Sequence, residues 1–194
     1  MKSSFKKVRM LFINSLESDY LQDLTYSGLA KVLDPSSIVE YPWNRYYHFG
    51  FREYPKNLGY KDKSLISSLT AKLKRGKYDF VFVASAKPET FRKYLEVVES
   101  IPQSTPVIFI DGGDFEQIGG DLKRLNAPEL FEEALMHRKF DAVFKREYLL
   151  NAEFDKNVFP LQFSFNYDRI PKDLPYRLKY QVTFWAVESN PIRS

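Results

Sequence analysis

The sequence predicts a Rossmann-like α/β domain: a doubly wound, mainly parallel sheet of five or slightly more strands with helices on both faces. Two observations carry this prediction. Short apolar runs rich in β-branched and aromatic residues alternate along the chain with helical patterns, in the order βαβαβαβαβ. Runs such as 80–83 and 107–110 contain no polar alternation, which indicates strands buried on both faces, as in parallel sheets covered by helices.

The strands and helices are predicted from these patterns in chain order. Five apolar runs are expected to form strands, at residues 8–13, 37–41, 79–84, 106–110 and 141–144. Amphipathic helical patterns lie between them, at residues 21–33, 65–73, 88–98 and 126–135. Asn126 and Glu129 resemble a capping box at the start of the last helix. We expect right-handed crossovers and the strand order 3-2-1-4-5, which places the first and fourth strands side by side.

The end of the chain follows a different pattern. At 194 residues, one domain or one domain plus a fragment is expected. We predict a Rossmann-like domain over 1–156, a proline-bearing linker over 157–179, and over 180–194 an added strand or the beginning of a second domain. The strand-like run 180–187 is followed by only seven residues. We therefore expect a βα unit that starts without being completed, in a chain that is half of something larger.

Composition and missing motifs narrow the function classes. The net charge is only +4, with acidic stretches among the basic ones, so nucleic-acid binding is not expected. The absence of cysteine excludes disulfides and thiol nucleophiles, and no His/Asp/Glu spacing indicates a metal site. Neither glycine-rich phosphate-binding motif is present, and no cofactor is expected. No apolar run is long enough for a signal peptide or a membrane span, so a cytoplasmic location is expected.

Polar residues follow four of the predicted strands, where open α/β sheets form their ligand crevice. The predicted substrate-binding residues at these strand ends are Asn14, Ser15, Ser85, Lys145 and Arg146. Asp111 and Asp114 flank a glycine pair and are predicted catalytic residues, able to act as a base or to bind sugar hydroxyls. Alternatively, both aspartates cap a loop and a helix start. Lys145 and Arg146 either hold an anionic group or are solvated or paired with Glu147. We expect the loops at Asn14 and at 111–114 to share one crevice.

The connection 42–60 contains seven aromatic residues interleaved with basic ones. Trp43, Tyr46 and Tyr47 are predicted to stack on a sugar or to form a protein interface, for example in a homodimer. The alternative is a loop that packs its rings onto its own domain. His48 is a candidate catalytic base, although no acidic partner is identifiable, and a partly exposed polar ring is the alternative. His137 is expected to be structural, near a helix end.

Four segments together, 8–14, 107–112, 144–149 and 159–164, resemble the N-terminal half of GT-B glycosyltransferases, particularly the bacterial group related to spore-maturation glycosyltransferases. The likeness spans nearly the whole chain and depends on the order of these strand-plus-turn pieces. In that family, residues 182–184 with Pro191 and Arg193 look like the opening of a second domain. The resemblance implies an acceptor-side domain that recognises a sugar or glycan, with the nucleotide-sugar site in a second domain. Asp111, Asp114 and His48 are then acceptor-base candidates by position, and this chain alone is not expected to transfer sugar.

Response-regulator receivers have a similar element order and a lysine near Lys145. In this chain, however, Ser85 stands where their phosphorylated aspartate is expected, and Asn14-Ser15 replaces their acidic pair. Phosphotransfer is therefore not expected. The remaining alternative to a glycosyltransferase domain is a non-catalytic α/β module that binds a partner through the aromatic loop 42–60.

Overall fold

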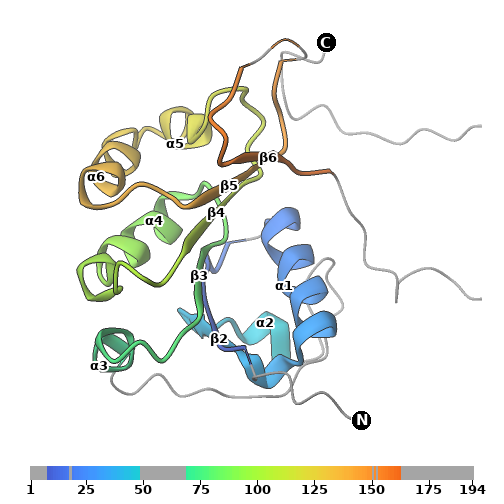
Figure 1. The fold of residues 1–194 in the computed structure, drawn as a ribbon. Helices are drawn as coiled ribbons and strands as arrows, with labels where there is room; N and C mark the ends of the chain where they lie inside the picture. Colours follow the sequence, from blue (N-terminus) through green and yellow to red (C-terminus); the bar gives the residue numbers. More distant parts are fainter. Residues whose placement is uncertain (1–7, 18, 49–68, 150, 152, 163–194) are drawn as a thin grey trace, which may run out of the picture.

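The computed structural model describes residues 8–17, 19–48, 69–149, 151 and 153–162, and its centre is a six-stranded sheet in which every pairing is parallel (Figure 1). The strands are β1 (Met10–Ile13), β2 (Ile38–Tyr41), β3 (Phe80–Val83), β4 (Val107–Asp111), β5 (Ala142–Lys145) and β6 (Val158–Pro160). The predicted α/β class and parallel sheet are confirmed.

The strand order is β2-β1-β3-β4-β5-β6, which differs from the predicted order. Met10 of β1 pairs with Ile38 on one side and with Phe80 on the other. The expectation that the first and fourth strands are neighbours is therefore wrong, because β3 lies between them. After β2 the chain crosses back over β1, and β3 is added on the other side of β1 rather than next to β2. The first five strands therefore follow the flavodoxin-like order 2-1-3-4-5. The order consequently reverses between β1 and β3.

The sixth strand extends the sheet beyond the five predicted runs. Val158 of β6 pairs with Val143 of β5, and Pro160 stands opposite Lys145. A proline is tolerated here because β6 is the edge strand of the described sheet. This strand begins inside the range predicted as a linker, 157–179. The rest of that range from residue 163 onward, together with the predicted run 180–187, lies outside the described residues.

Helices cover both faces of the sheet. In Figure 1, α1 (Tyr20–Leu33) and α2 (Arg45–His48) lie on one side, and the other helices lie on the opposite side. Those helices are α3 (Leu69–Lys74), α4 (Pro88–Leu95), α5 (Gly120–Arg124) and α6 (Glu129–His137), with the 3₁₀ turns η1 (Pro35–Ser37) and η2 (Val98–Ser100) between elements. None of the described helices is long and apolar enough to cross a membrane.

The predicted capping box before α6 is wrong. Asn126 has a φ of 57°, in the left-handed region that asparagine tolerates better than most residues. Its amide N–H donates to the Lys123 carbonyl (3.1 Å), so this residue lies in the turn just after α5. The residue that precedes α6 is Pro128, and no described side chain caps that helix. Asn126 therefore marks the end of one helix and not the start of the next. The helix that it follows, α5, was not predicted from the sequence.

Two apolar clusters fill the space on either side of the sheet. The larger one lies beneath α3 to α6 and contains a set of packed rings, with Phe91 to Phe109 at 5.3 Å and Phe109 to Phe140 at 5.0 Å between centroids. The smaller one lies beneath α1 and α2, where Phe12 meets Tyr26 edge to face at 5.4 Å. A large part of the unusual aromatic content is therefore core packing.

Candidate functional site

Because all strands are parallel, their carboxyl ends lie at one edge of the sheet, and most of the polar residues predicted there are buried. No more than 2 % of the surface is exposed in Asn14, Ser15, Ser85, Asp111 and Lys145. Buried polar groups of this kind need hydrogen-bond partners within the protein. The contacts of each residue therefore indicate which groups build the edge and which remain open to a ligand.

The loop after β1 is fixed against the start of α1. The Ser15 amide N–H donates to Gln22 Oε1 (2.8 Å), and Gln22 Nε2 donates to the Ser15 carbonyl (3.0 Å). Asp19 caps the helix, since its Oδ1 accepts the amide N–H groups of Leu21 (3.0 Å) and Gln22 (3.1 Å). Side-chain capping satisfies amide donors that a helix start otherwise leaves unpaired. The loop is consequently pre-positioned before any ligand arrives.

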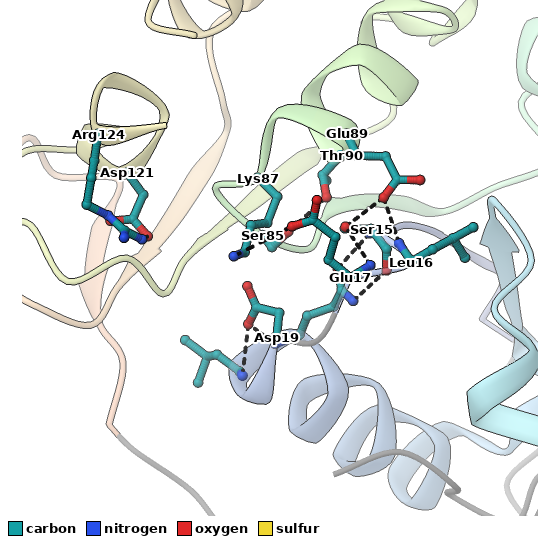
Figure 2. Close-up of polar contacts among 12 residues, drawn as sticks. Ser15, Leu16, Glu17, Asp19, Ser85, Lys87, Glu89, Thr90, Asp121 and Arg124 are labelled. Carbon is teal, nitrogen blue, oxygen red and sulfur yellow. Dashed lines mark hydrogen bonds and ion pairs between the residues drawn. The ribbon is translucent and has the colours of Figure 1, made fainter. Parts of the chain in front are cut away.

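The same loop is tied to α4 by Glu89. Glu89 Oε2 accepts both the Ser15 hydroxyl (2.8 Å) and the Leu16 amide N–H (2.9 Å), as Figure 2 shows. One turn away, the hydroxyls of Ser85 and Thr90 are 2.8 Å apart. Both predicted serines are thus engaged with the first turn of α4. The edge between β1 and β3, where the strand order reverses, is lined by hydroxyl and carboxylate groups.

Asp19 and Lys87 lie together above the start of α1 (Figure 2). Burial raises the pKa of Asp19, while its helix hydrogen bonds and the charges of Lys87 and Arg146 act in the opposite direction. Lys87 Nζ also lies 3.9 Å from Glu17 Oε2. The Asp19 carboxylate is therefore influenced by the α1 amides and by two cations, Lys87 after β3 and Arg146 after β5. Sequence reasoning missed Asp19 and Lys87, although an aspartate just before an amphipathic stripe was a signal for a helix cap.

Asp111 and Lys145 form a buried ion pair, with Lys145 Nζ 3.2 Å from Asp111 Oδ2. Asp111 also accepts the amide N–H groups of Gly119 (2.8 Å) and Gly113 (3.4 Å), and Lys145 donates to the Phe115 carbonyl. Burial raises the pKa of Asp111, and Lys145 and these amides oppose the rise. The pair anchors the loop after β4, which agrees with the alternative that this aspartate holds a loop. Its catalytic role stays a prediction.

Asp114 and Arg146 pair at the rim of the same edge. Arg146 Nε also lies 3.3 Å from Glu147 Oε1, so the predicted pairing of this cation with Glu147 is confirmed. Beside them, Arg124 Nη2 lies 3.3 Å from Asp121 Oδ2. Carboxylates therefore accompany both arginines at the rim.

The loops after β1 and β4 approach each other, although their strands are not neighbours. A Cβ on Gly112 would lie 2.4 Å from Leu21 Cδ2 of α1, so the β4 loop packs directly on that helix. Asn14 turns toward β2 instead, where its Nδ2 donates to the Pro42 carbonyl (2.8 Å). The side chains of Asn14 and Asp111 thus make their contacts on different sides of the edge. That these two loops share one crevice stays a prediction.

The described part of the aromatic loop, residues 42–48, packs onto its own domain. Tyr47 is fully buried, stacks on Tyr26 with centroids 4.2 Å apart, and donates its hydroxyl to Asp23 (2.9 Å). Trp43 stacks on His48 at 5.3 Å, with the ring planes 7° apart. Trp43 and Tyr46 remain half-buried. The rest of the loop lies outside the described residues.

His48 has an acidic partner that the sequence did not reveal. Its Nε2 lies 2.6 Å from Oε1 of Glu40, a β2 residue that is only 1 % exposed. Glu40 also accepts the Tyr26 hydroxyl (2.8 Å) and the Asn44 amide N–H (2.9 Å). Among the described residues, His48 Nδ1 has no hydrogen-bond partner. The imidazole is thus oriented by a carboxylate but enclosed, being 4 % exposed.

His137 is the last residue of α6, with its Nδ1 3.7 Å from Glu99 Oε1. Its predicted place near a helix end is confirmed. Within the described ranges, no group of three or more metal-ligating side chains could hold a metal ion.

Comparison with known proteins adds no relative to this geometry. No protein-family model, no curated protein and no solved structure matches the chain. The contacts and charges of the sheet edge are therefore the basis for assigning a function.

Proposed function

We propose that the carboxyl edge of the sheet binds a neutral, hydroxyl-rich ligand, and that the chain is the acceptor-side domain of a glycosyltransferase whose nucleotide-sugar site lies in a second domain. The observation that carries the proposal is the charge balance of this edge. Each of the four cations described there has a carboxylate within 4.0 Å: Lys87 with Glu17, Arg124 with Asp121, Lys145 with Asp111, and Arg146 with Asp114.

A paired cation is a poor site for phosphate, because its charge is already neutralised. Sugar hydroxyls, in contrast, donate readily to carboxylates and accept from ammonium groups. Glu17, Asp19 and Glu89 provide such acceptors around Lys87, at the point where the strand order reverses. This arrangement favours a neutral polyol over a nucleotide, as an acceptor site requires.

Asp19 is the carboxylate best suited to take the acceptor proton. Its Oδ1 is held by two amides of α1, which orients the group, and burial raises its pKa toward the range that a general base needs. In the reaction, the acceptor hydroxyl proton passes to this carboxylate. The acceptor oxygen bonds to the anomeric carbon of the donor, and the nucleoside diphosphate leaves. Asp111 and Asp114 are held in ion pairs with Lys145 and Arg146, and His48 is enclosed.

The experiment is a titration of the ¹⁵N-labelled chain with neutral mono- and disaccharides, followed by amide chemical shifts. Saturable shifts are expected at Leu16, Glu17 and Lys87. Asp19→Asn retains a helix cap but removes the charge, and is expected to weaken binding by about fivefold to tenfold. Nucleotide sugars are expected to bind weakly or not at all.

Asp34→Asn is the matched control, because Asp34 caps η1 through a 2.7 Å bond to the Ser36 amide and precedes β2 at the opposite edge of the sheet. It should leave sugar binding within about twofold of the parent. Shifts confined to Trp43 and Tyr46 would instead support the alternative, a binding module that uses the aromatic loop. An absence of saturable shifts with every sugar would contradict the proposal.

A further inference from the structure

A cavity lies at the edge of the sheet opposite the candidate functional site, at the amino ends of the first three strands. Its volume is about 370 Å³, within the range of small-molecule sites. Arg9 precedes β1, Ser36 and Ser37 precede β2, and the segment 72–78 joins α3 to β3. Neighbouring parallel strands start at the same edge, so these three segments meet although they are far apart in sequence.

Four cations line this cavity: Arg9, Lys72, Arg75 and Lys77. Among its described lining residues there is no aspartate or glutamate. None of the four side chains forms an ion pair with a described residue, and the carboxylate contact made by Arg9 comes from its backbone, whose amide donates to Asp79 (2.8 Å). Like charges held together without counterions raise the local positive potential. The cavity is thus the opposite of the carboxyl edge, where each described cation is paired.

Helix stabilisation accounts for part of this cluster only. Lys72 and Arg75 lie at the end of α3, which closes with Gly76 in the left-handed region (φ 59°), and cations there interact favourably with the helix dipole. Arg9 belongs to a different part of the chain, just before β1, and is not a residue of α3. Its charge nevertheless reaches the Tyr78 hydroxyl, where it opposes the rise in pKa that burial causes. Arg9 also lines the same cavity as Lys72 and Arg75.

We propose that this cavity binds a phosphate-bearing anion, such as a polyphosphate or a phosphorylated headgroup. Two guanidinium groups can each bind phosphate oxygens through two parallel N–H donors, and two ammonium groups add point charges. A single carboxylate would neutralise one of four cations, whereas a compound with two or more phosphates matches all of them. Tyr78 and Ser37 are buried residues that also line the cavity, beside these long charged side chains. The site is separate from the proposed acceptor site and does not depend on it.

The test is calorimetric titration of the full chain with tripolyphosphate at low ionic strength. One saturable site is expected, with affinity that falls as salt rises. The double variant Arg75→Ala/Lys77→Ala should weaken binding by at least about tenfold, since both side chains contact the anion. Lys74→Ala is the matched control, because Lys74 is an exposed cation of α3 that does not line the cavity. It should change the affinity by less than about twofold.

Thermal unfolding without ligand confirms that each variant is folded. An equal loss in Lys74→Ala would show unspecific attraction to surface charge and would overturn the proposal, as would a parent chain without saturable binding. Sedimentation with phosphatidylcholine vesicles, with and without phosphatidylinositol bisphosphate, distinguishes the two sources of phosphate. Retention that tripolyphosphate displaces indicates a lipid headgroup in the cavity. Saturable tripolyphosphate binding without retention indicates a free anion.

Discussion

Replacement of Lys145 by methionine tests the buried ion pair beneath the carboxyl edge. Asp111 and Lys145 are 0 % and 1 % exposed, with 3.2 Å between Asp111 Oδ2 and Lys145 Nζ. Removing one partner of such a pair leaves an uncompensated buried charge and costs about 3–5 kcal/mol. For a chain of this length, 1 kcal/mol corresponds to about 2–4 °C, so the melting temperature should fall by about 6–20 °C. Methionine conserves the aliphatic volume, and little of this loss comes from packing.

The loss should depend on pH, because Asp111 titrates. Burial raises the pKa of Asp111 above its ordinary value of 3.8, so the folded chain holds this proton more tightly than the unfolded chain. Its contribution to stability is therefore fully present below the unfolded pKa and is lost as pH rises through the folded pKa. Lys145 opposes the rise. Without Lys145 the pKa of Asp111 in the folded chain rises further, so Asp111 stays protonated to a higher pH in the variant. The difference in unfolding free energy between parent and variant should therefore be larger near about pH 8 than near about pH 5.

Guanidinium unfolding of the full chain, followed by circular dichroism at both pH values, measures the gap. Lys123→Met is the control, because Lys123 is an exposed lysine of α5, and its change should stay within about 0.5 kcal/mol. A loss in Lys145→Met below about 1 kcal/mol, the level of a surface pair, would refute the reasoning. A gap that stays constant with pH would show that Asp111 does not carry the cost.

Three further predictions concern packing and loop anchoring. Gly112→Ala should lower the free energy of unfolding by about 1–3 kcal/mol, because the added Cβ would lie 2.4 Å from a side-chain carbon of α1. Gly28→Ala should raise it by about 0.5–1 kcal/mol, because nothing lies within 4 Å of the added Cβ. Equal effects of the two substitutions in chemical denaturation would contradict this. Phe91→Ala, in the ring cluster beneath α4, should cost about 3–5 kcal/mol by the same measurement, and a loss under about 2 would mean that the cluster collapses around the gap. Arg138→Lys should cost about 1–3 kcal/mol, because a lysine cannot replace the guanidinium donors to three carbonyls of residues 102–105; unchanged stability would show that water replaces them.

The sheet was predictable because its strands are buried on both faces. The runs that became β3 and β4 contain almost no polar residue, and an apolar run too short for a helix is typical of a strand covered by helices on both sides. The strand order was not predictable in the same way. The crossover rule sets the handedness of each connection. It does not say whether the strand after β2 is added next to β2 or on the other side of β1, and that choice depends on how the later helices pack. α5 was missed because its five residues are too few to show an amphipathic repeat, and Gly119 (φ 73°) directly precedes it.

The positions of several candidate site residues were predictable, but Asp19, Lys87 and the partners of the others were not. Polar residues after parallel strands must meet at one edge, so Ser15, Ser85 and Lys145 were found from the sequence. Their contacts depend on which loops fold over that edge. Glu40 and His48 lie eight residues apart on a strand and a helix, and only the packing of α2 brings them to 2.6 Å. No local pattern encodes such a contact.

The shortness of β1 has a consequence for how the two proposed ligands would affect each other. Arg9 precedes this four-residue strand and Asn14 follows it, so the two sheet edges are about 16 Å apart at about 3.3 Å per residue. That separation is about two Debye lengths at physiological ionic strength, so a charge bound at one edge is largely screened from the other. The strand between them is buried and hydrogen-bonded on both sides, which leaves little freedom for a shape change to travel along it. Occupancy of the basic cavity should therefore leave the affinity for sugar unchanged. The two proposed sites would then bind their ligands independently, although both are built on β1.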